Sequence, residues 1–306
     1  MYPLKFTPIY KERIWGGNQL GKVFARALPS HHIGESWELS SRSNGISVVA
    51  NGVLAGKSLQ EIMVESPERL LGKKFANENH FPLLIKIIDA NDNLSIQVHP
   101  EYVYGVAEET GKTEAWYVVN AKEHAQIVYG LKTDITKEDL ITAVATHTIR
   151  DMVKIVPVQA GDMVLVPAGT VHALLDGVMV YEVQQNSDTT YRLYDYDRVG
   201  ADGNRRELHI KQALEVINFT EQSSCKFNVD RIKCQYFSMR KLRIQGVINE
   251  QTEDQFIIYC VIAGTGEIIY KDFVESLHAG DTLLIPACLH EFVITGNVEL
   301  LKITTT

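Results

Sequence analysis

One eight-residue pattern occurs twice in this chain and limits the folds that the chain can adopt. Residues 161–168 read GDMVLVPA, and residues 280–287 read GDTLLIPA. Each copy combines a Gly-Asp turn, an apolar strand and a proline, and each is soon followed by a histidine, His172 or His290. Two β units of one kind, the second beginning near residue 225, are the most economical explanation. We therefore expect one domain over residues 1–224 and another over residues 225–306.

Short strands separated by turns dominate the rest of the predicted secondary structure. Apolar, β-branched runs predict strands at 46–50, 81–88, 116–119, 125–129, 153–158, 163–166, 178–183, 256–262, 267–270, 282–285, 291–294 and 300–304. Asn51-Gly52 follows the first of these and predicts a hairpin turn. Helices are fewer, with starts predicted at Ser58, Ser66-Pro67, Thr136 and His209. The chain is therefore expected to be mainly β, with a few inserted helices, because it lacks alternating βαβ units.

Composition excludes several classes of protein. Hydrophobic residues make up 45% of the 306 residues and charged residues 22%, which excludes a largely disordered chain. The net charge of −8 argues against a general binder of nucleic acid or of anionic membranes. No apolar run is long enough to span a bilayer and no secretory signal is visible, so we expect a cytoplasmic protein. Cys225, Cys234, Cys260 and Cys288 form no CxxC pair and are expected to be free thiols.

The first copy of the repeat belongs to a longer pattern, Gly-x5-Pro-x-Gly-x2-His, which ends at His172. This pattern resembles the second motif of the cupin jelly-roll barrel, in which the histidine is a metal ligand. The resemblance implies an earlier motif with two ligands two residues apart and a carboxylate further on, for which the chain offers Gln97, His99 and Glu114. Residues at i and i+2 of a strand share a face, so Gln97 and His99 can both point into a barrel. Imidazole and carboxylate ligands suit Zn²⁺, and the alternative is a set of ordinary hydrogen-bonded core residues.

The second copy departs from the cupin pattern. Cys288 replaces the motif glycine, His290 comes one residue early, and no histidine-rich first motif precedes it. We interpret residues 225–306 as a cupin-like domain without a metal.

Four separate motifs extend the resemblance to a family. They are LSIQVHP at 94–100, GKTE at 111–114, PAGTVH at 167–172 and QNSDTTYR at 185–192. Their order and spacing resemble the type I mannose-6-phosphate isomerases, and the length resembles the short bacterial branch. The resemblance implies one Zn²⁺ per chain, held by Gln97, His99, Glu114 and His172, with Arg192 as the active-site arginine. It also places Lys86, Ser95, Lys112 and Asp188 in the substrate pocket. The family often has Lys-Pro-Glu where this chain has Lys112-Thr113-Glu114.

The resemblance implies the interconversion of mannose 6-phosphate and fructose 6-phosphate through an enediol. One base would move a proton between C2 and C1, and Asp188, Lys112 and Glu182 are the candidates that the sequence leaves open. Arg192 offers a planar fork for the phosphate, and Lys86 and Ser95 offer further contacts. We expect a small sugar phosphate as partner, no nucleic acid or membrane, and a monomer or homodimer. The alternatives are an Fe(II) cupin oxygenase and a non-catalytic sugar-binding cupin.

Overall fold

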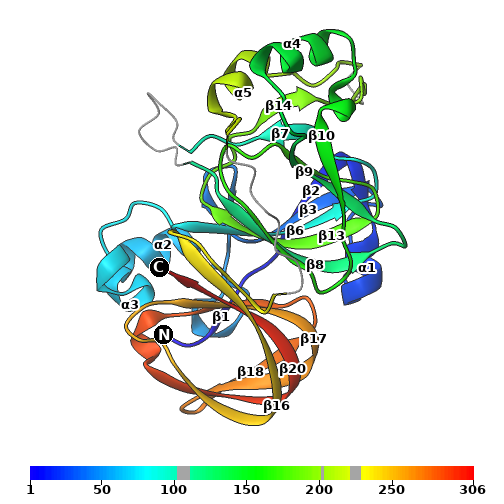
Figure 1. The fold of residues 1–306 in the computed structure, drawn as a ribbon. Helices are drawn as coiled ribbons and strands as arrows, with labels where there is room; N and C mark the ends of the chain where they lie inside the picture. Colours follow the sequence, from blue (N-terminus) through cyan, green and yellow to red (C-terminus); the bar gives the residue numbers. More distant parts are fainter. Residues whose placement is uncertain (102–110, 201–202, 221–228) are drawn as a thin grey trace. The chain divides into compact units, whose positions relative to one another are not determined.

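The computed structural model describes residues 1–101, 111–200, 203–220 and 229–306, and most of its regular elements are strands (Figure 1). The mainly β prediction is therefore confirmed. The chain forms two compact units. The terminal unit combines Met1–Ile9, Trp37–Lys86 and Val229–Thr306, and the central unit combines Tyr10–Ser36 and Ile87–Asn228. None of the described helices is long and apolar enough to cross a membrane.

The central unit encloses an apolar core between two sheets. The five-stranded sheet has the order β10 (Val153–Pro157), β9 (Gln126–Leu131), β12 (His172–Leu174), β7 (Ile96–Val98), β14 (Tyr191–Tyr194). The six-stranded sheet has the order β11 (Met163–Val166), β8 (Glu114–Ala121), β13 (Val178–Gln185), β6 (Leu83–Ala90), β3 (Ile33–Leu39), β2 (Ile9–Gly17). Ile127 and Leu174 of the first sheet pack with Val164 and Val180 of the second. Burial of this apolar surface stabilises the sandwich.

Two helices cover the outer face of the five-stranded sheet. Helix α4 (Lys137–Ala145) begins with the predicted cap at Thr136, and α5 (Ile210–Val216) follows His209. Their apolar residues pack with Val98 and Ala173 of the sheet. Because side chains alternate along a strand, the residues next to Val98 and Ala173 point inward instead. Gln97 and His172 are two such residues, so the sheet carries polar groups into the interior.

The terminal unit contains a seven-stranded sheet with much longer strands. Its order is β1 (Leu4–Lys5), β19 (Thr282–Ile285), β17 (Ile257–Tyr270), β20 (Glu291–Thr305), β16 (Phe237–Gln251), β15 (Arg231–Lys233), with β18 (Phe273–His278) paired to β17. This unit also contains the short elements β4 (Ser41–Arg42), β5 (Gly45–Ile46), α2 (Leu59–Glu65) and α3 (Pro67–Leu71), whereas α1 (Gln19–Phe24) belongs to the central unit. Helix α2 begins with the capping box predicted at Ser58.

The strands predicted at 256–262 and 267–270 are one strand, β17, and those at 291–294 and 300–304 are one strand, β20. Glycines lie in the gaps between these predicted strands, and their role is in packing. A Cβ at Gly264 would lie 2.1 Å from the carbonyl oxygen of Asn297, and a Cβ at Gly266 would lie 2.3 Å from that of Thr295. Glycine here permits two backbones to approach closely within a continuous sheet.

The tight hairpin turn predicted at Asn51-Gly52 is a longer loop, which contains a 3₁₀ turn, Gly52–Leu54, and across which Val48 bridges antiparallel to Ser58. The Asn51 side chain holds the first strand instead. Its Oδ1 accepts from Lys5 N at 3.0 Å, and its Nδ2 donates to the carbonyl oxygen of Pro3 at 3.0 Å. Gly52 has a φ of +59°, and a Cβ there would lie 2.5 Å from the Tyr2 ring. These two residues therefore anchor the first strand from within the loop that reverses the chain.

The sequence assigned residues 1–9 and 37–86 to the first domain, whereas they group with residues 229–306. Strand pairing is one reason, since Leu4 of β1 pairs with Leu284 of β19. The boundary predicted between 224 and 225 lies outside the described residues, and the domain division stays a prediction. Cys225 also lies outside them, whereas Cys234, Cys260 and Cys288 are free thiols.

The repeated segment adopts the same local structure in both units. In the central unit, Val118 N donates to Asp162 O at 2.9 Å and Gly161 N to Val118 O at 2.8 Å. In the terminal unit, Val261 N donates to Asp281 O and Gly280 N to Val261 O, both at 2.8 Å. The two aspartates also accept backbone N–H groups at 2.8 Å in the same way. The repeat thus gives a residue-by-residue correspondence between β8 and β17.

A buried carboxyl group predicts an unusual pH dependence of stability. Asp89 is 1% exposed, and burial raises its pKa to about 6, although its Oδ2 accepts from Gln19 N at 2.6 Å. The folded protein holds this proton after the unfolded chain has lost it. Stability from Asp89 is therefore full below the unfolded pKa of 3.8 and falls as pH rises to 6.

The free energy of unfolding of wild type, relative to Asp89→Asn, should fall by up to about 3 kcal/mol between pH 4 and pH 7. Denaturant titrations of metal-free protein at several pH values measure the difference. A difference that is constant with pH would show that Asp89 titrates normally.

Candidate metal centre

Strand pairing places a polar row on the inner face of the five-stranded sheet. His172 of β12 lies opposite Gln97 of β7, and Gln97 lies opposite Arg192 of β14. Tyr129 of β9 lies on the other side of His172. Directly opposed residues of antiparallel strands point to the same face. His99 follows β7 and shares the face of Gln97, so both predicted first-motif residues point inward.

The six-stranded sheet brings two carboxylates to the facing surface. Glu114 and Trp116 share a face of β8, where Glu114 pairs with Gln184 and Trp116 with Glu182 of β13. Trp116 Nε1 donates to Glu182 Oε2 at 3.1 Å, which fixes that carboxylate. Both glutamates are almost completely buried. Charged groups buried in this way require nearby counter-charges or a cation.

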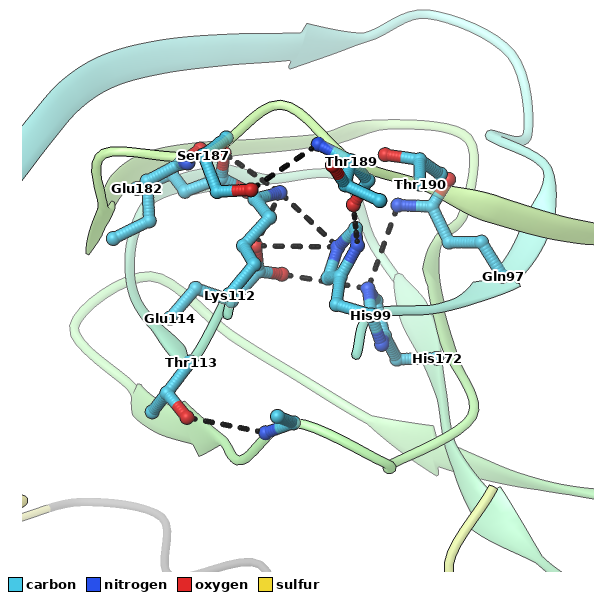
Figure 2. Close-up of polar contacts among 12 residues, drawn as sticks. Gln97, His99, Lys112, Thr113, Glu114, His172, Glu182, Ser187, Thr189 and Thr190 are labelled. Atoms are coloured by element: carbon cyan, nitrogen blue, oxygen red, sulfur yellow. Dashed lines mark hydrogen bonds and ion pairs between the residues drawn. The ribbon is translucent and has the colours of Figure 1, made fainter. Parts of the chain in front are cut away.

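Glu114, the first residue of β8, meets two imidazoles at the ends of the strands β7 and β12 (Figure 2). Its Oε2 lies 3.5 Å from His99 Nε2, and its Oε1 lies 3.4 Å from His172 Nε2. All three residues are 1% exposed, and their ligand atoms lie within 4.8 Å of one another. No other group of three His, Cys, Asp or Glu side chains with this geometry occurs in the described part of the chain.

Backbone carbonyls fix the tautomer of both histidines. His99 Nδ1 donates to Thr189 O and His172 Nδ1 donates to Thr170 O, each at 2.8 Å. The Nε2 lone pair of each ring therefore points toward Glu114. Burial, reinforced by the Lys112 charge, lowers the pKa of His172 to about 4. His172 is thus neutral at pH 7, which is the form that binds a metal.

Lys112 brings a buried positive charge to the same point. Its Nζ lies 2.6 Å from Glu114 Oε2 and 3.0 Å from His99 Nε2, with Glu182 Oε1 at 3.7 Å. Burial opposes the charged form, but the Glu114 and Glu182 carboxylates prevail and raise the pKa of Lys112. The ligand atoms of Glu114 and His99 therefore already stabilise one cation, the Lys112 ammonium group.

Gln97 lies beside the cluster, with its amide toward His172. Gln97 Nε2 lies 3.4 Å from His172 Nε2, and Gln97 Oε1 accepts from Ser95 Oγ at 3.0 Å. A half-turn of the amide would bring Oε1 to the imidazoles and Nε2 to the Ser95 hydroxyl, which accepts equally well. Ser95 thus adjoins the fourth predicted ligand.

The donor set fits a divalent ion. Two neutral imidazoles with fixed tautomers, one carboxylate and one amide oxygen match the ligands that Zn²⁺ accepts. The net ligand charge of about −1 would leave a zinc site positive enough to act as a Lewis acid. The residues present therefore fit the ion that the sequence predicted.

Arg192 points to the same face from the edge strand β14. Its Nε is buried and has no hydrogen-bond partner among the described residues. Burial, with the Arg206 charge nearby, lowers the pKa of Arg192. A half-buried guanidinium with a buried, unsatisfied donor is costly, so this position favours an anionic ligand. The backbone of Arg192 is held by two hydrogen bonds with His209.

Two other predicted pocket residues are placed less directly. Lys86 is buried in β6, where it shares a strand face with Ile88, and its Nζ lies 5.5 Å from the Trp37 ring centroid. Asp188 is exposed in the segment after β13, and its carbonyl oxygen accepts from Thr190 Oγ1 at 3.4 Å. The roles of both residues stay predictions.

Sequence reasoning missed the groups that orient the ligands. The carbonyl oxygens of Thr170 and Thr189 carry no side-chain signal, although Thr170 lies within the motif, two residues before His172. Thr113, which departs from the family's proline, accepts Ala168 N at Oγ1 and donates its own N–H to Gln185. The threonine therefore takes part in holding the motif loops.

Together, the β-sandwich and the buried His–Glu–His cluster define a cupin with a site suited to a metal ion. The model of the phosphomannose isomerase type I catalytic domain matches residues 3–122, and that of the mannose-6-phosphate isomerase cupin domain matches residues 229–305. The chain belongs to the type I phosphomannose isomerase family.

Curated relatives and solved structures agree with this assignment. The chain is 40% identical to the mannose-6-phosphate isomerase ManA of Bacillus subtilis over 97% of each chain. It is 37% identical to the mannose-6-phosphate isomerase of Streptococcus mutans, covering 98% of this chain and 97% of the relative. The crystal structure of the mannose 6-phosphate isomerase from B. subtilis superposes with a TM-score of 0.91 at 35% identity, over 99% of both chains.

Proposed function

We propose that this chain is a zinc-dependent aldose–ketose isomerase that interconverts mannose 6-phosphate and fructose 6-phosphate. The buried cluster of His99, Glu114 and His172, in a chain of this family, carries the proposal. Gln97 would complete the ligand set. A zinc ion held there would polarise a sugar oxygen and stabilise negative charge that develops beside it.

The cationic side chains would bind different parts of the substrate. Arg192 would hold the phosphate through its guanidinium, with Lys86 and Ser95 as further contacts. Lys112 is held as an ammonium by Glu114 and Glu182, so it would donate a hydrogen bond to a sugar oxygen rather than accept a proton. The buried sheet faces around it would exclude water from the reacting carbons.

The isomerisation requires a base that removes the proton from C2 and returns it to C1. As C2 loses its proton, the C1 carbonyl oxygen gains a proton and becomes a hydroxyl of the enediol. When C1 then receives a proton, the O2 hydroxyl loses its own and becomes the ketose carbonyl. Since Lys112 is held charged, Asp188 and Glu182 are the remaining candidates. Trp116 already orients the Glu182 carboxylate, and Asp188 lies in the exposed segment beside Thr189.

A coupled assay on metal-quantified protein tests the proposal. We expect conversion of mannose 6-phosphate to fructose 6-phosphate that a chelator abolishes and added zinc restores, because neutral imidazoles and Glu114 hold the ion. Oxygen consumption, measured in parallel with Fe(II)-loaded protein, should be absent. A fully zinc-loaded protein without turnover would refute the isomerase and favour a sugar-binding cupin.

A further inference from the structure

A second pocket lies in the terminal unit, where β15, β16, β17 and β20 meet (Figure 1 labels the last three). Its volume is about 180 Å³. Its lining residues include the cations Arg231, Arg240 and Lys302 and the hydroxyls of Ser238 and Thr304. None of these residues belongs to the metal centre, so the proposed function does not account for the pocket.

The repeated segment shows which positions of the two units correspond. Val166 of the first copy pairs with Glu114, and its counterpart Ile285 in the second copy pairs with Ile257. The position of the metal-ligand carboxylate is therefore occupied by an isoleucine. Ile257 lines the terminal pocket. The pocket thus contains the position that corresponds to a metal ligand of the central unit. The isoleucine side chain at that position cannot bind a metal.

The next corresponding pair reverses a charge. Trp116 of β8 lies opposite Glu182, and its counterpart Tyr259 of β17 lies opposite Lys302. A buried carboxylate in the central unit is therefore replaced by a lysine. Lys302 forms an ion pair with Glu250, and Arg240 lies opposite Lys302 on β16. The strand position that carries a buried glutamate in one unit carries a half-buried lysine in the other, and Arg231 and Arg240 beside it are exposed.

The two arginines leave charge available for a ligand. Arg231 pairs with Arg240 across β15 and β16, and Arg231 Nε donates to Ser238 Oγ at 3.1 Å. Arg240 has no ion-pair partner among the described residues. Glu253 also lines the pocket and Glu250 neutralises Lys302, so the two arginines leave one positive charge in excess. Like charges directly opposed across strands are destabilising, which an anion between them would relieve.

We propose that this pocket binds a phosphate group, either as free phosphate or as the phosphate of a small metabolite. Two guanidiniums can each offer paired N–H donors to phosphate oxygens, and the Ser238 and Thr304 hydroxyls offer further donors. The small volume suits a phosphate with a few attached carbons rather than a large cofactor. The site is separate from the proposed isomerase centre and needs no metal.

Calorimetric titration of the full, zinc-loaded chain with inorganic phosphate at low ionic strength tests the proposal. We expect binding in wild type that Arg231→Ala/Arg240→Ala weakens at least about tenfold, and that added salt weakens. Because Arg192 would also bind phosphate, the same titration is made on Arg192→Ala, which should keep the binding lost in the double variant. Arg240→Lys keeps the charge without the fork and should give an intermediate affinity.

Arg243→Ala is the matched control, since Arg243 lies on the same strand, is exposed and pairs with Glu299 instead of lining the pocket. Turnover of the double variant should stay within about twofold of wild type, which also reports correct folding. The part of mannose 6-phosphate binding that Arg231→Ala/Arg240→Ala removes from an Arg192→Ala background then separates the sources: tighter binding than phosphate identifies a sugar phosphate, and equal binding identifies phosphate alone. Undiminished binding in the double variant, or equal loss in Arg243→Ala, would overturn the proposal.

Discussion

Replacing His172 by alanine is expected to lower zinc affinity and isomerase activity by more than about 100-fold, since loss of a ligand's supporting partner alone costs about 10- to 100-fold. The imidazole is 1% exposed, and its Nε2 lies 3.4 Å from Glu114. No neighbouring imidazole can replace it, because His99 is held in its own position by Thr189. Competition with a chromogenic chelator and the coupled assay measure the two losses.

The variants for this test should separate ligand loss from unfolding. His172→Gln retains most of the side-chain volume and should also lose metal, while far-UV circular dichroism stays unchanged. His290→Ala is the matched control, because His290 follows the second copy of the repeat and its side chain is 69% exposed. Full zinc content in His172→Ala would remove His172 from the ligand set.

Arg192→Ala should cost roughly 100-fold in kcat/KM for mannose 6-phosphate, because charge-assisted hydrogen bonds to phosphate are lost. The buried Nε without a described partner is the structural reason to expect an anion there. Free mannose lacks the phosphate, so its much slower turnover should change little. Steady-state kinetics with both sugars provide the comparison.

Arg205→Ala is a suitable control for this second variant. Arg205 is 65% exposed and pairs with Asp197, so its loss should leave both substrates unaffected. Arg192→Lys should recover part of the loss, since it keeps the charge but not the planar fork. Equal losses with phosphorylated and free sugar would show that Arg192 acts on the reacting end of the sugar instead.

The ligand cluster was predictable from sequence because its residues lie at fixed offsets within short strands. Gln97 and His99 share a face by alternation, and the glycine-proline pattern identifies His172. Glu114 required the family resemblance, since no local rule pairs β8 with β12. The carbonyl groups of Thr170 and Thr189 could not be predicted, because a backbone oxygen carries no residue-specific signal.

In the fold, too, features that depend on neighbouring residues were predictable and long-range features were not. Apolar runs and caps located most strands and the helices starting after Ser58 and Thr136, because these depend on neighbouring residues. The length of β17 and β20 was missed, since glycines such as Gly264 and Gly296 occur both in turns and where two paired strands approach closely. The chain-spanning pair of β1 and β19 was missed because nothing local specifies it.

That last pair sets the order in which the protein can be completed during synthesis. Leu4 emerges from the ribosome long before Leu284, yet the two become strand partners. Contacts between such distant positions raise the contact order and slow folding. Until β19 is made, β1 lacks its strand partner and the apolar side chain of Leu4 is exposed to solvent. Such exposed apolar surface promotes aggregation. The central unit closes on nearer partners, so it can fold while the terminal unit still waits for its last strands.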